Sequence, residues 1–256
     1  GITHREETAT KARERKLAHF VGTDPQVLKD CSIIYIALPL QQLINPSSVL
    51  INAIPRNAVV TDVGSVKVPI LNTWKSLHPR FVASHPMTGT EESGVNAGKQ
   101  NLFRHKPWVV TPDKATDQQA LEVIHQIALS LGCKWISAEA QTHDEAVGLI
   151  SHLPVLISAA LINTLSDDMN PSIYSLAKSI SSNGFADTSR IGGGNPELGV
   201  SMAKFNKENL MKSLLSYRNS LDLFEKYLIE ENWNEFENIL VNTHENRKNF
   251  ITKSTN

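Results

Sequence analysis

Short apolar runs alternate with longer amphipathic stretches over about the first 140 residues of the chain. The runs are apolar almost without interruption, and the stretches between them have helical spacing. Near-continuously apolar strands separated by helices are typical of a parallel sheet covered on both faces. The pattern therefore predicts an α/β domain, with strands at 32–38, 58–63, 81–84, 108–111 and 133–137 and helices at 8–15, 40–54, 68–77 and 117–131.

The first three predicted strands end in residues that break regular structure. Leu38-Pro39 follows the first strand, Gly64-Ser65 the second and His85-Pro86 the third. The carboxyl ends of parallel strands meet at one edge of a sheet, where open α/β sheets bind their ligands. We therefore expect these three tips to form loops along a ligand-binding edge.

The pattern changes after about residue 142, and no convincing strand follows. Thr142 and Glu145 have the spacing of a capping box, which predicts the start of a helix that runs to about Leu165. That helix is apolar nearly all round, so we expect it to be central and buried. Pro154 is expected to kink it.

Segment 210–228 carries apolar residues spaced alternately four and three apart. This heptad-like seam requires a partner helix, which can come from the same chain or from a second subunit. A polar amphipathic helix is predicted over 233–250. The chain is therefore divided into a sheet domain, residues 1–143, and an all-helical domain, residues 144–256.

Composition and charge exclude several classes of protein. Of the 256 residues, 41% are hydrophobic and 20% are charged, which is typical of a soluble globular protein. The net charge of −1 argues against a nucleic-acid partner. No run approaches the roughly 18 apolar residues of a membrane span, so no membrane partner is expected. We expect a cytoplasmic protein, or a protein of the plastid stroma if it comes from a plant, although the chain contains no transit peptide.

The cysteines give no sign of a metal site. Cys31 and Cys133 are the only two, and each lies in an apolar stretch, which indicates buried free thiols in a reducing compartment. Neither a CxxC nor an HExxH pattern occurs, so no metal is predicted.

His85 is the candidate base, because an imidazole with a pKa near 6.5 can accept a proton at neutral pH. Ser65, at the neighbouring strand tip, can hydrogen-bond that imidazole. Ser65 can also cap the helix that follows, and both roles can hold together. His152, on the apolar helix, is interpreted as a hydrogen-bonded core residue.

Arg190 is the candidate for binding a carboxylate, since its guanidinium suits fork-like recognition. The glycines that follow it predict a mobile or tightly turned loop rather than a helix. Thr90 and Glu91 belong to an acidic cluster. A carboxylate there can pair with Arg190, join Asp187 in an ion network, or simply be solvated.

Five ordered motifs together resemble the arogenate/prephenate dehydrogenase family of tyrosine biosynthesis, particularly its cyanobacterial and plant-like arogenate branch. The resemblance covers almost the whole chain. The motifs are Thr-Asp-Val-Gly-Ser-Val-Lys at 61–67, Ser-His-Pro-Met-Thr-Gly at 84–89, His143-Asp144, Ser-His-Leu-Pro at 151–154, and Asp-Thr-Ser-Arg at 187–190 with Gly-Gly-Gly-Asn-Pro-Glu at 192–197.

The resemblance implies a Rossmann-type dinucleotide-binding domain followed by a helical domain that forms a homodimer. It also implies oxidative decarboxylation of a cyclohexadienyl substrate, with hydride transfer to a nicotinamide. His85 would then accept the hydroxyl proton, and Ser65 would position His85 and the substrate. Arg190 would hold a substrate carboxylate. The other substrate-binding residues, which lie around that arginine, would be Thr90, Glu91 and Asp187.

Two departures from the family pattern carry information. Some prephenate-preferring relatives have a second histidine where this chain has Val155, so we expect arogenate as the substrate. The family also begins with a strand and a Gly-x-Gly-x-x-Gly loop that this chain lacks, while residues 1–3 resemble the end of the second strand. About 25–30 residues of the usual domain are thus absent, and we expect a fragment or incomplete gene product rather than a naturally truncated, poor catalyst.

The end of the second strand usually carries an acidic residue that holds the ribose of NAD. Here the chain reads Thr3-His4-Arg5, and hydroxyl and basic groups suit the 2′-phosphate of NADP, so NADP is preferred over NAD. His4 and Arg5 can alternatively be exposed residues at a helix start. Leu38 and Pro39 are expected to contact the nicotinamide side.

The leading hypothesis is therefore an NADP-dependent arogenate dehydrogenase. One alternative is an NAD-dependent prephenate dehydrogenase, and another is a non-catalytic dimerising remnant that lacks the glycine loop. A β-hydroxyacid-type dehydrogenase shares the architecture but would need a lysine base on the interdomain helix. None occurs between Asp144 and Leu165.

Overall fold

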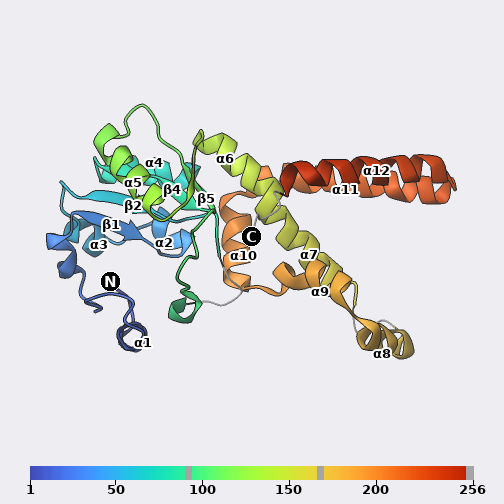
Figure 1. The fold of residues 1–256 in the computed structure, drawn as a ribbon, viewed down its shortest axis with the longest axis horizontal. Helices are drawn as coiled ribbons and strands as arrows, with labels where there is room; N and C mark the ends of the chain where they lie inside the picture. Colours follow the sequence, from blue (N-terminus) through green and yellow to red (C-terminus); the bar gives the residue numbers. More distant parts are fainter. Residues whose placement is uncertain (90–93, 166–169, 252–256) are drawn as a thin grey trace. The chain divides into compact units, whose positions relative to one another are not determined.

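The computed structural model describes residues 1–89, 94–165 and 170–251. Within it the chain forms two compact units, Gly1–Leu210 and Met211–Asn256 (Figure 1). The first unit contains the strands and most of the helices, and the second contains two long helical segments. Thr90 and Glu91, two of the predicted substrate-binding residues, lie outside the described residues.

The strands form two consecutive ladders. In the first, β1 (Ile33–Ile36), β2 (Val59–Asp62) and β3 (Phe81–Val82) are parallel. In the second, β4 (Ser84–Pro86) pairs with β5 (Pro107–Val110), which pairs with β6 (Lys134–Ser137). Since only one residue separates β3 from β4, a single extended stretch joins the two ladders. All five predicted strand positions are confirmed.

The prediction of an entirely parallel sheet is wrong for one pair, because β4 and β5 are antiparallel. A parallel crossover usually needs a helix that packs on the sheet. The described part of the connection from β4 to β5 contains only the short 3₁₀ helix η2 (Gly94–Ala97). The chain therefore returns along the same edge and pairs in the opposite direction, with His85 opposite Val109.

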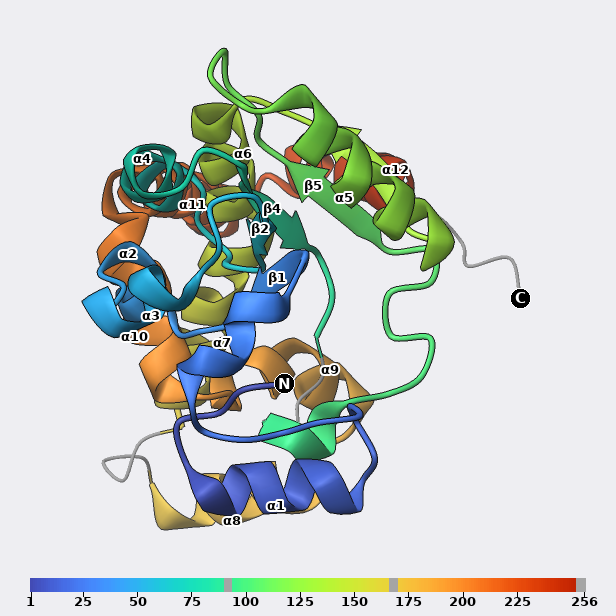
Figure 2. The same ribbon diagram turned by 90° about the vertical axis from the view of Figure 1, so that its left-hand side faces the viewer.

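Helices cover both faces of the sheet, as predicted. Successive residues of β2 point to opposite faces, and Val60 joins a core with Trp74 of α4 (Val68–Leu77), while Val59 joins a core with Ile124 of α5 (Gln118–Ser130). The two helices lie on opposite sides of the strands (Figure 2). The strand that carries Asp62 is consequently buried along its whole length.

The amino-terminal part of the chain precedes the first strand. Ile2 forms an isolated parallel bridge with Gly22, and α1 (Glu6–Glu14) and the 3₁₀ helix η1 (Pro25–Asp30) complete this region. The single helix predicted over 40–54 is two helices, α2 (Leu40–Ile44) and α3 (Ser48–Ala53). The chain breaks there because Pro46 disfavours helical backbone before it and Ser47 caps α3 by accepting a hydrogen bond from the Leu50 amide.

A long helical segment follows the sheet, composed of α6 (Ala140–Val147), the π-helical turn η3 (Gly148–His152) and α7 (Leu153–Asn163). The predicted capping box is wrong, because α6 begins two residues before Thr142 and its N-cap is Glu139. The π turn directly precedes the turn that contains Pro154, the residue at which a kink was predicted.

The prediction that this segment is central and buried is also wrong for the protomer. Leu149 and Ile150 are more than half exposed. By length and mean hydropathy, 1.8, the helix Ala140–Asn163 could even cross a membrane, and only 28% of its most apolar window is buried. The expectation that no segment is long and apolar enough to span a membrane is therefore wrong by this criterion.

The remaining helices of the first unit are short. They are α8 (Pro171–Ile180), α9 (Asn183–Ser189), the 3₁₀ helix η4 (Arg190–Gly193) and α10 (Pro196–Phe205). The second unit contains most of α11 (Lys207–Ile229) and all of α12 (Trp233–Phe250), as predicted (Figure 1). Phe224 of α11 contacts Phe236 of α12 edge to face, so part of the seam finds its partner within the chain.

Candidate active site

The structure places three predicted tips at one edge of the parallel ladder. Leu38 and Pro39 follow β1, Ser65 follows β2, and His85 lies on β4 directly beyond β3. Because β1, β2 and β3 are parallel and paired in register, their carboxyl ends face the same way. Pro39 is exposed and Leu38 is half-buried, so this edge presents backbone and apolar surface.

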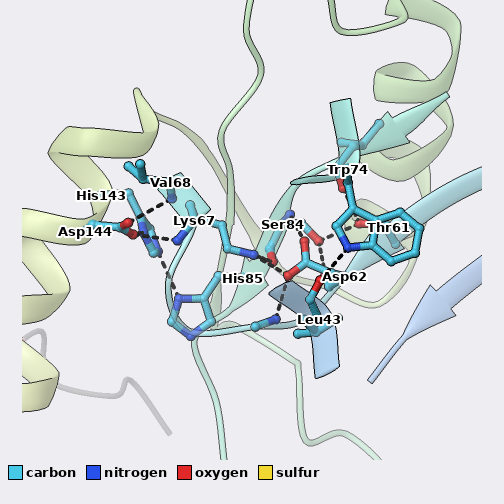
Figure 3. A network of polar contacts seen from close by, with 12 residues as sticks. Leu43, Thr61, Asp62, Lys67, Val68, Trp74, Ser84, His85, His143 and Asp144 are labelled. Carbon is cyan, nitrogen blue, oxygen red and sulfur yellow. Dashed lines mark hydrogen bonds and ion pairs between the residues drawn. The ribbon is translucent and has the colours of Figure 1, made fainter. Parts of the chain in front are cut away.

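A buried lysine connects the ends of these strands. The ammonium of Lys67 donates to Oδ2 of Asp62 at 2.5 Å and to the carbonyl of Ser84 at 2.6 Å (Figure 3). The other Asp62 oxygen accepts from the Ser84 amide at 3.0 Å. Neither Lys67 nor Asp62 has an exposed side chain. Burial lowers the pKa of Lys67, and the Asp62 carboxylate opposes that shift.

Asp144 of α6 forms the cap of α4. Its two carboxylate oxygens accept hydrogen bonds from the amides of Lys67, at 2.7 Å, and Val68, at 2.9 Å (Figure 3). A carboxylate at a helix amino terminus satisfies orphan amides and interacts favourably with the helix dipole. Ser65 was predicted as a possible cap of this helix, but Asp144 performs that role from a distant part of the chain.

His85 contacts a second histidine rather than Ser65. Nδ1 of His85 lies 2.9 Å from Nε2 of His143, whose Nδ1 lies 2.7 Å from Oδ1 of Asp144 (Figure 3). The hydroxyl of Ser65 is buried and has no hydrogen-bond partner among the described residues, so the hydrogen bond expected between Ser65 and His85 is not made. An orphaned hydroxyl beside the strand tips is available to a ligand.

The surroundings of His85 keep it neutral. Burial is the largest cause that lowers its pKa well below the ordinary value, and the Lys67 ammonium is the next. His85 is only 9% exposed. An imidazole that stays neutral at physiological pH can accept a proton from a bound hydroxyl.

His152 was interpreted as a hydrogen-bonded core residue, and the structure agrees for one of its nitrogens. Nδ1 lies 3.2 Å from the amide nitrogen of Asn206, while the buried Nε2 has no partner. Burial lowers the pKa of His152 to about 4. Asn206 also donates to the carbonyl of Asp144, so it links this histidine to the cap of α4.

Arg190 lies at the start of η4, which packs against α7. Gly192 of this turn donates its amide to the Ser158 hydroxyl at 2.8 Å. The tight turn predicted at the glycines after Arg190 is confirmed, and Asn183–Ser189 before it form helix α9. Arg190 and Asp187 are exposed in the protomer. Among the described residues, no hydrogen bond between Arg190 and His85 is seen.

The three amino-terminal residues assigned to the cofactor lie at the start of α1. Thr3 donates its hydroxyl to the carbonyl of Arg5, which is the N-cap of this helix. His4 and Arg5 are exposed. Exposure is compatible with both interpretations, binding of the 2′-phosphate and a simple helix start, so it does not decide between them. In the described part of the chain, no group of three or more His, Cys, Asp or Glu side chains could hold a metal ion.

Three functional candidates were not found from the sequence. Lys67, His143 and Asp144 stand in the motifs that carry the family resemblance, but the sequence alone assigns them no role. The available signal was Lys67, which lies between two valines, since a charged group is rarely fully buried unless it is paired.

Comparison with known proteins assigns the chain to a family. Residues 1–137 match the profile described as "Prephenate dehydrogenase, nucleotide-binding domain", and residues 139–242 match "Prephenate dehydrogenase, dimerization domain". The chain belongs to the prephenate dehydrogenase family. Its fold is accordingly a Rossmann-like sheet domain followed by a helical dimerisation domain.

Individual relatives agree. The chain is 37% identical to arogenate dehydrogenase of Synechocystis, with a TM-score of 0.81 over 98% of this chain and 90% of that one. It is 27% identical to prephenate dehydrogenase of Aquifex aeolicus in complex with hydroxyphenyl propionate and NAD⁺, with a TM-score of 0.89 over 98% and 88%. It is 27% identical to prephenate dehydrogenase of Bacillus subtilis over 80% of this chain, but it spans only 56% of that relative.

Several helices of the second matched region carry exposed apolar faces. Large apolar side chains lie exposed on α8 and α10, where Ile180 is 69% and Val200 67% exposed. A cavity of about 420 Å³ lies beside α8 and is lined by Leu165, Tyr174, Ala177, Lys178, Ile180, Ser181 and Phe185. The family model that matches this region is described as a dimerization domain.

Proposed function

We propose that this chain carries the active site of an NADP-dependent arogenate dehydrogenase, which converts arogenate to tyrosine and CO₂ while a hydride passes to NADP. One observation carries the proposal. His85 is a buried, neutral imidazole at the carboxyl edge of a Rossmann-like sheet, and its second nitrogen makes no hydrogen bond to any described residue. The base is thus held where a ring hydroxyl beside a nicotinamide would lie.

The residues of the chain then have defined tasks. His85 accepts the hydroxyl proton while the ring carbon loses its hydride, and it returns that proton to the phenol oxygen after the carboxylate has left as CO₂. The nicotinamide supplies the hydride acceptor when it is bound. Arg190 holds a carboxylate of the substrate. Aromatisation supplies much of the driving force, so the main task of the protein is orientation.

The cofactor fits the groups at this edge. The orphaned hydroxyl of Ser65 offers a hydrogen bond, and Leu38 and Pro39 present an apolar tip to the nicotinamide side. Just before α1, Thr3, His4 and Arg5 offer hydroxyl and basic groups to a 2′-phosphate, which supports NADP over NAD.

Two observations support arogenate over prephenate. Val155, near the start of α7, stands where some prephenate-preferring relatives have a histidine, and an apolar side chain cannot donate to a keto acid. The similarity to the Synechocystis arogenate dehydrogenase supports the same choice. The Aquifex complex, which holds NAD⁺ and a phenolic acid, supports a small ring acid beside a nicotinamide in this fold.

We also propose that two protomers associate through the helical domain. The exposed apolar side chains of α8 and α10 and the exposed face of η3 support this assembly, as does the match to a dimerisation domain. The near-neutral charge and the absence of a basic motif support small molecules, rather than nucleic acids, as ligands.

The test is to measure turnover of arogenate and prephenate, each with NADP and with NAD. The highest kcat/KM is expected for arogenate with NADP, and His85→Asn serves as the inactive control. Exclusive use of prephenate with NAD would replace this proposal by the prephenate alternative. If none of the four pairs reacts and NADP does not bind at millimolar concentration, the chain is a dimerising remnant.

A further inference from the structure

We propose that His143 and Asp144 are positioning residues, which hold His85 in the tautomer that carries its proton on Nδ1 and leaves the lone pair of Nε2 free. This inference rests on the proposed role of His85 as proton acceptor. Neither residue reaches the substrate edge directly, because His143 contacts His85 and Asp144 contacts His143 (Figure 3).

The first step is the contact between Asp144 and His143. A carboxylate oxygen can only accept a hydrogen bond. At 2.7 Å from Oδ1 of Asp144, Nδ1 of His143 must therefore carry a proton and donate it. A neutral His143 with its proton on Nδ1 presents a lone pair at Nε2.

The second step follows from the contact between the two rings. Nε2 of His143 and Nδ1 of His85 lie 2.9 Å apart, so a proton must lie between them. Because Nε2 of a neutral His143 is an acceptor, Nδ1 of His85 is the donor. The lone pair of His85 is then on Nε2, which points away from His143 in Figure 3. No described residue hydrogen-bonds that nitrogen, so it is available as a base.

The series of contacts from His85 through His143 to Asp144 ends at backbone amides, which hold it in place. Asp144 is held by the amides of Lys67 and Val68, which fixes both carboxylate oxygens. The side chains of His143 and Asp144 are each only 2% exposed. The orientation of the His143 ring is thereby set by the cap of α4, and the tautomer of His85 is set by that ring.

A single extra proton would reverse the arrangement. If His143 gained a proton on Nε2, it would donate to Nδ1 of His85, and the His85 proton would move to Nε2. The site would then present a donor instead of a base.

The tautomers can be measured without any turnover. Nitrogen-15 NMR of the complete chain, labelled at histidine, distinguishes a protonated ring nitrogen from one with a free lone pair. We expect protonated Nδ1 and unprotonated Nε2 for both His85 and His143 above neutral pH, with His85→Asn and His143→Gln used for assignment. A proton on Nε2 of His85 would overturn the inference, whether or not the chain is a dehydrogenase.

Two variants at one position give the kinetic test. In His143→Leu the acceptor is lost, so kcat is expected to fall about 10²-fold with KM within about twofold, and the acid limb of the pH profile to move. In His143→Gln a carbonyl oxygen can again accept from His85, so most of kcat should return. Thermal unfolding of both variants shows whether they fold equally well.

The outcomes separate the two proposals. Equal loss in the Leu and Gln variants, with an unchanged tautomer of His85, overturns the positioning role while the proposed function stands. Full activity of His85→Asn overturns the proposed function, and the NMR result then still decides the tautomer.

Discussion

Lys67 and Asp62 form an ion pair in which Nζ and Oδ2 are 2.5 Å apart and neither side chain is exposed. Desolvating two charges is costly, and such a pair is tolerated only when its remaining donors and acceptors are satisfied. Here the Ser84 carbonyl accepts a second hydrogen bond from the ammonium, and the amides of Gly64 and Ser84 donate to the carboxylate. The pair thereby connects the ends of β2 and β4 beside the candidate base.

Replacing Lys67 by methionine should destabilise the protein strongly. The Asp62 carboxylate would stay buried without its cation, and breaking a buried pair in this way costs about 3–5 kcal/mol. Urea unfolding at neutral pH measures the change. The matched control is Lys75→Met, since Lys75 lies exposed on α4, where its ammonium donates to Asn72. Similar small changes for both variants would show that the pair is not needed for stability.

Two adjacent glycines in the turn after Arg190 should respond very differently to alanine. A Cβ on Gly192 would lie 2.4 Å from backbone atoms of α7, whereas a Cβ on Gly193 meets nothing within 4 Å. Gly192→Ala must therefore push η4 away from α7, and we expect destabilisation of roughly 1–3 kcal/mol. Since Arg190 begins the same turn, the KM for arogenate should rise in Gly192→Ala and stay unchanged in Gly193→Ala. Equal KM values in the two variants would show that substrate binding by Arg190 does not depend on the position of this turn.

Arg190 itself is expected to act through substrate binding. Loss of a charge-assisted partner costs about 2–4 kcal/mol, so Arg190→Ala should raise KM for arogenate by roughly 30-fold to 1,000-fold with a smaller change in kcat. Steady-state kinetics with saturating NADP gives both constants. Arg190→Lys keeps the charge but loses the fork-like geometry of the guanidinium, so its KM should lie between those of the unaltered chain and Arg190→Ala. If Arg190→Ala has the same KM as the unaltered chain, Arg190 does not bind the substrate.

The strands could be predicted because a strand that is buried on both faces needs apolar residues at consecutive positions. Val59 and Val60 enter different cores, so both must be apolar, and the run is visible without knowledge of the fold. The direction of β4 could not be read in this way. It depends on the connection that follows Pro86, and the apolar run 81–84 is compatible with either pairing.

The polar contacts of the site were harder to predict than its location. His85 was found because it stands at a strand tip, which is a local property of the sequence. The cap on α4 comes from Asp144, 76 residues after the Val68 amide that it accepts from, and nothing local marks that pairing. Thr142 and Glu145 have capping-box spacing, yet α6 begins before them, because the spacing alone does not fix where a helix starts.

The apolar helix was misread for a related reason. Leu149 and Ile150 are apolar because they face something, and a single sequence does not say whether that is the interior of the same chain or a second protomer. The exposed fraction in the protomer and the family match together favour the second protomer.

The cofactor preference can be tested at the start of α1. Arg5 is exposed, so Arg5→Ala should leave the fold intact while removing a cation from the expected position of the 2′-phosphate. The Kd for NADP is expected to rise about tenfold with little change for NAD, since one exposed charge pair contributes up to about 1 kcal/mol and more when partly desolvated. Arg56→Ala, an exposed arginine before β2, is the control. Equal effects on both cofactors would argue for the helix-start interpretation of Arg5.

His152 should make stability depend on pH in a defined window. Its pKa is lowered to about 4 in the folded protein, against an ordinary value of 6.5, so the unfolded chain binds a proton first as the pH falls. Stability from this residue is therefore complete above about pH 6.5 and is lost progressively down to about pH 4.

Between about pH 7.5 and about pH 5, His152 alone should cost about 2 kcal/mol of the free energy of unfolding. His152→Gln, whose side-chain oxygen can still accept from Asn206, should lose about 2 kcal/mol less than the unaltered chain over the same interval. His244→Gln, at an exposed position on α12, is the control and should follow the unaltered chain. Urea titrations at the two pH values give all the differences, and an identical pH dependence in His152→Gln would mean that this histidine titrates alike in the folded and unfolded states.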